Sequence, residues 1–176
     1  KAVLTGANSS PVPWGVHHKE RRTLALDVVL TNLAPAREAE SPWLVHRLAE
    51  QPVSLVGTPA RLGPLPRTVD QVLSGQPLVL PGPGTALRAA FDALVARSGI
   101  LPIIAAEADD MAMLRLLARE DAGVAVLPTI VVQDELASGL LVEAGRLEGM
   151  RETFYAVTRE RRFPNPLLSP LLQSAG

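Results

Sequence analysis

A short apolar run, a turn rich in proline and glycine, and a helix pattern follow one another in residues 78–99, and this unit constrains the fold most. Residues 78–80, Leu-Val-Leu, are bounded by turn residues, which is typical of a buried strand. Pro, Gly, Pro and Gly then precede Thr85, which stands at the N-cap position of a helix that Gly99 is placed to end. Strand, turn and capped helix form half of an α/β unit, and the start of the helix would lie at the carboxyl edge of the sheet.

The sequence allows two interpretations of Thr85. Ser and Thr are such common N-caps that a purely structural role is favoured by about two to one when the turn is taken alone. The competing interpretation is ligand binding, because the first turn of a helix has free backbone N–H groups and carries the positive end of the helix dipole.

Strand and helix patterns alternate between about residue 57 and residue 151. This alternation predicts a mostly parallel, doubly wound α/β sheet, whose strand-end loops meet at one edge because the crossovers share one hand. Strands are predicted at 2–5, 24–30, 43–49, 53–57, 78–80, 101–107, 123–128, 140–143 and 154–158. Helices are predicted at 69–73, 85–98, 129–137 and 167–173, with one more starting after Asp109 or Asp110.

Composition bounds the class of protein. Of 176 residues, 47% are hydrophobic and 3% are aromatic, so one domain or two small lobes with an aliphatic core are expected. A net charge of −1 argues against nucleic-acid binding by this chain itself, since phosphate contacts need a basic surface. The absence of cysteine excludes disulfides and thiolate metal sites, and no apolar run is long enough to predict a membrane span. His17 and His18 are adjacent, and metal binding by this pair has odds of about one in ten.

Several motifs of the chain resemble, in their order and spacing, the effector-binding domain of LysR-type transcriptional regulators. They are the strand pattern at 26–31, the 78–87 unit followed by Arg88, the turn 107–110, the Gly-Val-Ala-Val-Leu-Pro run at 123–128, the stretch 134–142, the Phe-Tyr-Ala-Val run at 154–157, and Asn165-Pro166. The likeness is nearest to the NhaR-type subgroup, which activates sodium/proton antiporter genes, through residues 81–88, 107–111, 145–148 and 154–162.

The resemblance implies two Rossmann-like α/β lobes with a ligand cleft between them, as in periplasmic-binding-protein-like folds of type 2. The first lobe would comprise residues 1–52 and 153–176, abbreviated at its N-terminus, and the second residues 53–152, with hinges near 53–58 and 153–158. A small molecule or ion would bind in the cleft as the effector. The implied effector-binding residues are Thr31 and Asn32 from the first lobe and Pro83, Gly84, Thr85, Glu107, Pro128 and Thr129 from the second.

The implied function is ligand sensing by a cytoplasmic, DNA-binding transcription regulator that activates its targets and needs no cofactor. DNA would be bound only through an N-terminal winged helix-turn-helix, which this chain lacks. A homodimer or tetramer is implied, with residues 85–98 and 101–106 at the interface. If the antiporter likeness holds, sodium, lithium or alkaline pH is the signal, and Glu107, Thr85 and the carbonyls of 81–84 would supply oxygen ligands.

Two alternatives stay open from the residues alone. A solute-binding protein of a transport system would have the same cleft. An enzyme using Asp109 or Asp110 with a histidine has odds below about one in ten, because no nucleophile elbow, phosphate-binding loop or metal-ligand spacing is present. We therefore expect a protein that is not an enzyme.

Overall fold

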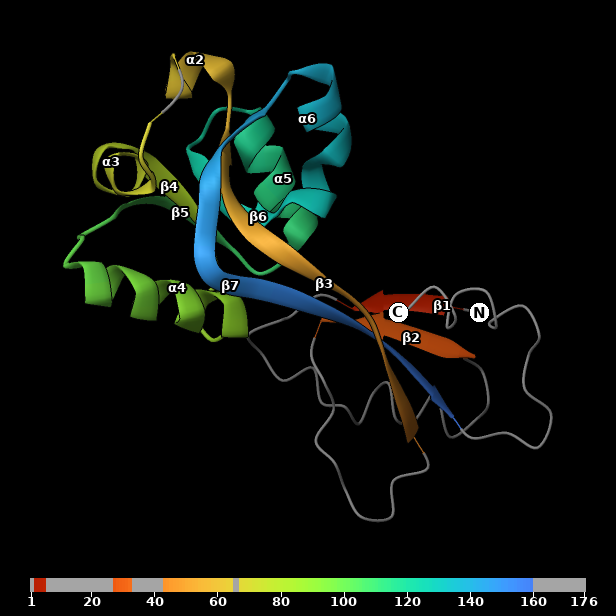
Figure 1. Ribbon diagram of the computed structural model, residues 1–176. Coiled ribbons are helices and arrows are strands. Elements are labelled where there is room, and N and C mark those ends of the chain that lie inside the picture. The colour runs from red at the N-terminus through yellow and green to blue at the C-terminus, as the bar shows by residue number, and fades with distance from the viewer. Residues whose placement is uncertain (1, 6–26, 33–42, 65–66, 160–176) are drawn as a thin grey trace. The chain divides into compact units, whose positions relative to one another are not determined.

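The computed structural model of the chain describes residues 2–5, 27–32, 43–64 and 67–159 (Figure 1). The chain divides into two compact units, one formed by Lys1–Glu50 with Thr153–Gly176 and the other by Gln51–Glu152. Two long strands, β3 (Trp43–Gly57) and β7 (Val142–Arg159), each contribute residues to both units.

The unit Gln51–Glu152 contains a sheet flanked by helices. Besides parts of β3 and β7, its elements are α2 (Pro59–Leu62), α3 (Val69–Gly75), β4 (Pro77–Pro81), α4 (Ala86–Ser98), β5 (Ile103–Ala108), α5 (Met111–Arg119), β6 (Val124–Pro128), the 3-10 helix η1 (Thr129–Val132) and α6 (Gln133–Ser138). β4 pairs in parallel with β5 and β6, and β6 pairs antiparallel with β3. The predicted α/β class is confirmed: β4, β5 and β6 are parallel, and β3 enters the sheet antiparallel.

The core of this unit lies on both faces of the sheet and is aliphatic, as the composition predicts. Successive residues of a strand point to opposite faces, so Leu78 and Leu80 pack in one cluster and Val79 in the other. The first cluster holds Leu87, Phe91 and Val95 of α4, and the second holds Leu114 and Ala118 of α5. Helices α4 and α5 therefore cover opposite faces of the sheet.

The other unit is described through β1, β2 and the parts of β3 and β7 that belong to it. The strand predicted at residues 2–5 is β1 (Ala2–Thr5). It pairs in parallel with β2 (Val28–Thr31), which pairs antiparallel with the end of β7. The side chains of His46 on β3 and Thr158 on β7 are hydrogen-bonded, with 3.1 Å between Nε2 and Oγ1. His17, His18, Asn165, Pro166 and the helix predicted at 167–173 lie outside the described residues.

Two pairs of predicted strands are single long strands in the structure. Residues 43–49 and 53–57 belong to β3, which continues through Gln51 and Pro52. Proline fixes φ near −65°, which strands tolerate, and its missing N–H removes one ladder bond without ending the strand. Residues 142–143 and 154–158 likewise belong to the 18-residue strand β7. Both predictions were wrong because a local turn signal does not end a strand that is held by pairing with neighbouring strands.

The carboxylate of Glu135 ties α6 to α5. Its side chain is 4% exposed, and its Oε1 accepts a hydrogen bond from Arg115 Nε at 2.7 Å, with Arg119 Nη1 at 3.8 Å. Burial acts to raise the pKa of Glu135, but the hydrogen bond and charge of Arg115 outweigh it and hold this pKa below its ordinary value.

Glu135→Gln is expected to remove an acid-sensitive part of the stability. Because the folded pKa is depressed, the ion pair contributes fully above the unfolded pKa of about 4.3, and its contribution is lost as the pH falls through the folded value. The variant should lose about 1–2 kcal/mol at neutral pH and show a shallower acid limb in urea unfolding. Asp134→Asn is the control, since Asp134 is 93% exposed and 4.0 Å from Arg115 Nη2. An unchanged acid limb in Glu135→Gln would contradict the assignment.

Candidate functional site

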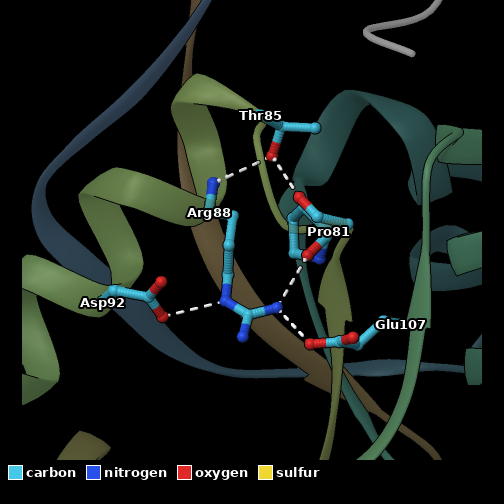
Figure 2. Close-up of polar contacts among 6 residues, drawn as sticks. Pro81, Thr85, Arg88, Asp92 and Glu107 are labelled. Carbon is cyan, nitrogen blue, oxygen red and sulfur yellow. Dashed lines mark hydrogen bonds and ion pairs between the residues drawn. The ribbon is translucent and has the colours of Figure 1, made fainter. Parts of the chain in front are cut away.

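The turn formed by residues 81–85, here called the 81–85 turn, joins β4 to α4 (Figure 2). Thr85 is the N-cap of α4: its Oγ1 accepts a hydrogen bond from Arg88 N at 3.1 Å and donates one to Gly82 O at 3.1 Å. The hydroxyl is thus engaged inside the turn, and Thr85 is 7% exposed. The first-turn N–H groups of Ala86 and Leu87 have no acceptor within the helix.

The neighbouring loop approaches this turn closely at Gly82. A Cβ built on Gly82 would lie 1.8 Å from Asp109 Oδ1, so any other residue would displace the Asp109 side chain. The backbone N–H of Gly82 also donates to Ala108 O at 2.9 Å. The ends of β4 and β5 are therefore held together beside the start of α4.

Arg88, in the first turn of α4, links three elements through its guanidinium (Figure 2). Its Nε donates to Asp92 Oδ1 at 2.8 Å, and its Nη1 donates to Pro81 O at 3.2 Å and to Glu107 Oε1. The side chain is 13% exposed. Burial acts to lower the pKa of Arg88, but the hydrogen bonds and charges of Glu107 and Asp92 outweigh it and raise this pKa above the ordinary value.

Six of the predicted effector residues lie at the ends of parallel strands of one unit. Pro83 and Gly84 are exposed in the turn, Thr85 is buried, and Glu107 lies near the end of β5 with 38% of its side chain exposed. Pro128 is buried at the end of β6, and Thr129, half-buried, begins η1.

Thr31 and Asn32 belong to the other unit. They lie at the end of β2, where Thr31 is 6% exposed and Asn32 is half-buried. Their part in a site shared with the six residues above stays a prediction.

Four of the oxygens predicted to bind a cation already accept hydrogen bonds, namely Pro81 O, Gly82 O, Thr85 Oγ1 and Glu107 Oε1. Arg88 donates to Pro81 O and to Glu107, and Gly82 O accepts from both the N–H and the hydroxyl of Thr85. A guanidinium beside these oxygens repels a second cation. Within the described ranges, no three His, Asp or Glu side chains gather as a metal site.

Sequence reasoning missed the role of Arg88. Two local signals in the sequence point to a role for Arg88: it is three residues after the N-cap, and Asp92 is four residues further along the helix. Of the two candidate caps of α5, Asp110 is the one used, since its Oδ1 accepts from Met113 N at 2.7 Å.

Thr85→Ala is expected to lower the free energy of unfolding by about 1 kcal/mol, the usual cost of losing an N-cap hydroxyl. Thr85→Ser keeps the hydroxyl and should retain most of the stability. Urea unfolding followed by circular dichroism measures both. Equal losses in the two variants would show that the hydroxyl is not what stabilises the start of α4.

The chain matches the family model described as the LysR substrate binding domain over residues 22–175. It therefore belongs to this family of LysR-type regulatory domains, whose fold is periplasmic-binding-protein-like, type 2. Domains of this family are regulatory and not enzymatic. A search of curated proteins by sequence found no match.

Solved structures of LysR-type regulators share the fold. The transcriptional regulator CbnR is 15% identical with a TM-score of 0.67, the match covering 99% of this chain and 67% of CbnR. The effector-binding domain of QuiR in complex with shikimate is 15% identical with a TM-score of 0.61, covering 99% of this chain and 92% of that domain. DarR of Vibrio fischeri in complex with DNA is 19% identical with a TM-score of 0.65, and the match covers 92% of this chain and 54% of DarR.

Among the described residues, none of the helices combines the length and apolar character needed to cross a membrane.

Proposed function

We propose that the chain senses a small-molecule effector for a LysR-type transcription regulator and that the effector contacts the 81–85 turn. The observation that carries the proposal is made at the start of α4. Pro83 and Gly84 are exposed there, and the N–H groups of Ala86 and Leu87 lack intrahelical acceptors. The chain also matches the LysR substrate binding domain family. A carboxylate or carbonyl oxygen of the effector would accept from these groups.

The other contacts of the effector are proposed from the family likeness. Pro128 and Thr129 would contribute from the end of β6. Thr31 and Asn32 would contribute from a first lobe comprising residues 1–52 and 153–176, across a cleft from the second lobe at 53–152. Effector binding would favour one arrangement of the lobes over others and so alter the linked DNA-binding segment.

A more specific hypothesis is that the signal is sodium, lithium or alkaline pH, as for an NhaR-type regulator of antiporter genes. The contacts at the turn weigh against a cation at Glu107, since Arg88 already neutralises that carboxylate. An organic anion is favoured instead. A transport role is less favoured, because the matched family consists of regulatory domains.

Association of two copies is proposed through α4 and β5. β5 stands at the end of the strand order of the sheet, and its apolar side chains are exposed, with Ile103 at 56% and Ile104 at 44%. Leu101, just before the strand, is 90% exposed. An exposed apolar edge strand is a ready surface for another chain. DNA binding would belong to a segment other than the matched domain at residues 22–175.

A thermal-shift series tests the proposal. The chain is heated with sodium, lithium or potassium chloride at matched ionic strength and two pH values, and with a panel of small carboxylates that includes shikimate. An effector at 100 times its dissociation constant should stabilise the folded chain by about 2.7 kcal/mol. A shift with a carboxylate supports the proposal. A shift with sodium or lithium but not potassium would contradict the anion preference, and no shift with any compound counts against effector binding by this chain.

A further inference from the structure

The contacts of Arg88 differ from those of an ordinary surface ion pair. A single guanidinium donates to a backbone carbonyl of β4, to a carboxylate of β5 and to a carboxylate of α4, and its side chain is 13% exposed (Figure 2). The carbonyl belongs to Pro81, the first residue of the turn. Arg88 therefore contacts both ends of the 81–85 turn, because its own backbone N–H donates to Thr85 Oγ1.

We propose that Arg88 is a positioning residue of the effector site, and that Glu107 acts by holding Arg88 and not by contacting the effector. The inference rests on the proposed function, because Arg88 can position an effector site only if an effector binds at the 81–85 turn. Arg88 fixes the distance between the last residue of β4 and the first turn of α4, and with it the direction of the N–H groups of Ala86 and Leu87.

Glu107 orients Arg88 from the neighbouring strand. In the register of the sheet, Glu107 of β5 is paired with Leu80 of β4, one residue before the carbonyl that Arg88 binds. Two acceptors on adjacent strands thus fix the same nitrogen, Nη1. Loss of either the guanidinium or the Glu107 carboxylate should loosen the turn, even though the two residues are on different elements.

Arg61 supplies a matched control in the same unit. Its side chain is 19% exposed, its Nε lies 2.8 Å from Asp121 Oδ1, and its Nη2 donates to the backbone carbonyl of Asp121. Arg61 thus also joins a carboxylate and a carbonyl, but it connects α2 to the segment between α5 and β6. Arg61→Gln removes a comparable set of bonds away from the 81–85 turn.

Amide hydrogen exchange of the full chain, resolved by NMR, tests the inference without a ligand. The amides to follow are Thr85, Arg88 and Ala89, which donate to Gly82 O, Thr85 Oγ1 and Thr85 O; Leu114 in α5, which donates to Asp110 O, is the internal reference. Arg88→Gln and Glu107→Ala should accelerate exchange at the turn at least tenfold and leave Leu114 within twofold. Arg88→Lys, which keeps a donor and the charge, should restore part of the protection.

The outcomes separate positioning from general stability. If Arg88→Gln accelerates Leu114 as much as the turn, or if Arg61→Gln accelerates the turn equally, Arg88 is only a structural ion pair and the inference is wrong. Unchanged exchange at the turn in Arg88→Gln overturns it as well. Failure of the proposed function would be seen separately, as the absence of any stabilising compound in the thermal-shift series.

Discussion

Phe91→Ala is expected to lower the free energy of unfolding by about 3–5 kcal/mol, the usual cost of emptying a buried aromatic site. Phe91 is fully buried in the centre of α4 and packs in the cluster that contains Leu78 and Leu80 of β4. Its ring attaches α4 to the sheet, and α4 carries the N-cap Thr85. The variant should therefore also loosen the 81–85 turn. The proposed effector would then bind more weakly, in addition to the loss of stability.

Leu116→Ala is the control for Phe91→Ala, because Leu116 is 46% exposed on α5 and leaves no internal cavity. Its effect should lie within about 0.5 kcal/mol of zero, as for surface substitutions generally. Urea unfolding of both variants measures the difference. A Phe91→Ala loss below that of Leu116→Ala would mean that α4 is not held by this cluster.

Gly123→Ala is expected to destabilise the chain by about 2–3 kcal/mol, in the upper part of the range for overpacked cores. A Cβ at Gly123 would lie 2.7 Å from the backbone oxygen of Pro77 and 3.1 Å from Val79 Cγ2. A backbone oxygen at the start of a central strand cannot move aside as a flexible side chain would. The new methyl group would push apart β4 and the start of β6, whose other ends carry the candidate site.

Gly75→Ala provides the matched substitution. A Cβ at Gly75, the last residue of α3, meets no atom within 4 Å. Replacing glycine where the backbone already suits alanine usually stabilises, by about 0.4–1 kcal/mol. The two substitutions are therefore expected to change the free energy of unfolding in opposite directions, as measured by urea unfolding. No change in this free energy in Gly123→Ala would show that the strands can separate without cost.

The fold of the unit Gln51–Glu152 could be predicted largely from local patterns. Thr85 is the N-cap of α4 and Gly99 is its C-cap, as predicted. Local signals suffice there because caps and apolar periodicity act within one turn of helix. The extent of β3 and β7 could not be predicted in this way, because it depends on pairing with strands far along the chain.

The candidate site was predictable as a place but not as a set of contacts. The 81–85 turn and the ends of β5 and β6 follow from the order of strands and helices. The pairing of Glu107 with Arg88 does not, because the two residues are 19 positions apart and meet only once β4 and β5 are in register. The prediction of a cation ligand at Glu107 assumes a free carboxylate. In the fold, Arg88 neutralises that carboxylate.

The most direct test of the central claim is hydrogen exchange of the full chain with and without each member of the small-carboxylate panel. We expect that a compound raising the melting temperature also slows exchange of the Ala86 and Leu87 amides, at least tenfold near saturation, because it accepts their hydrogen bonds. A compound that stabilises the chain while leaving these two amides unchanged and protecting amides elsewhere would contradict the placement of the effector at the 81–85 turn.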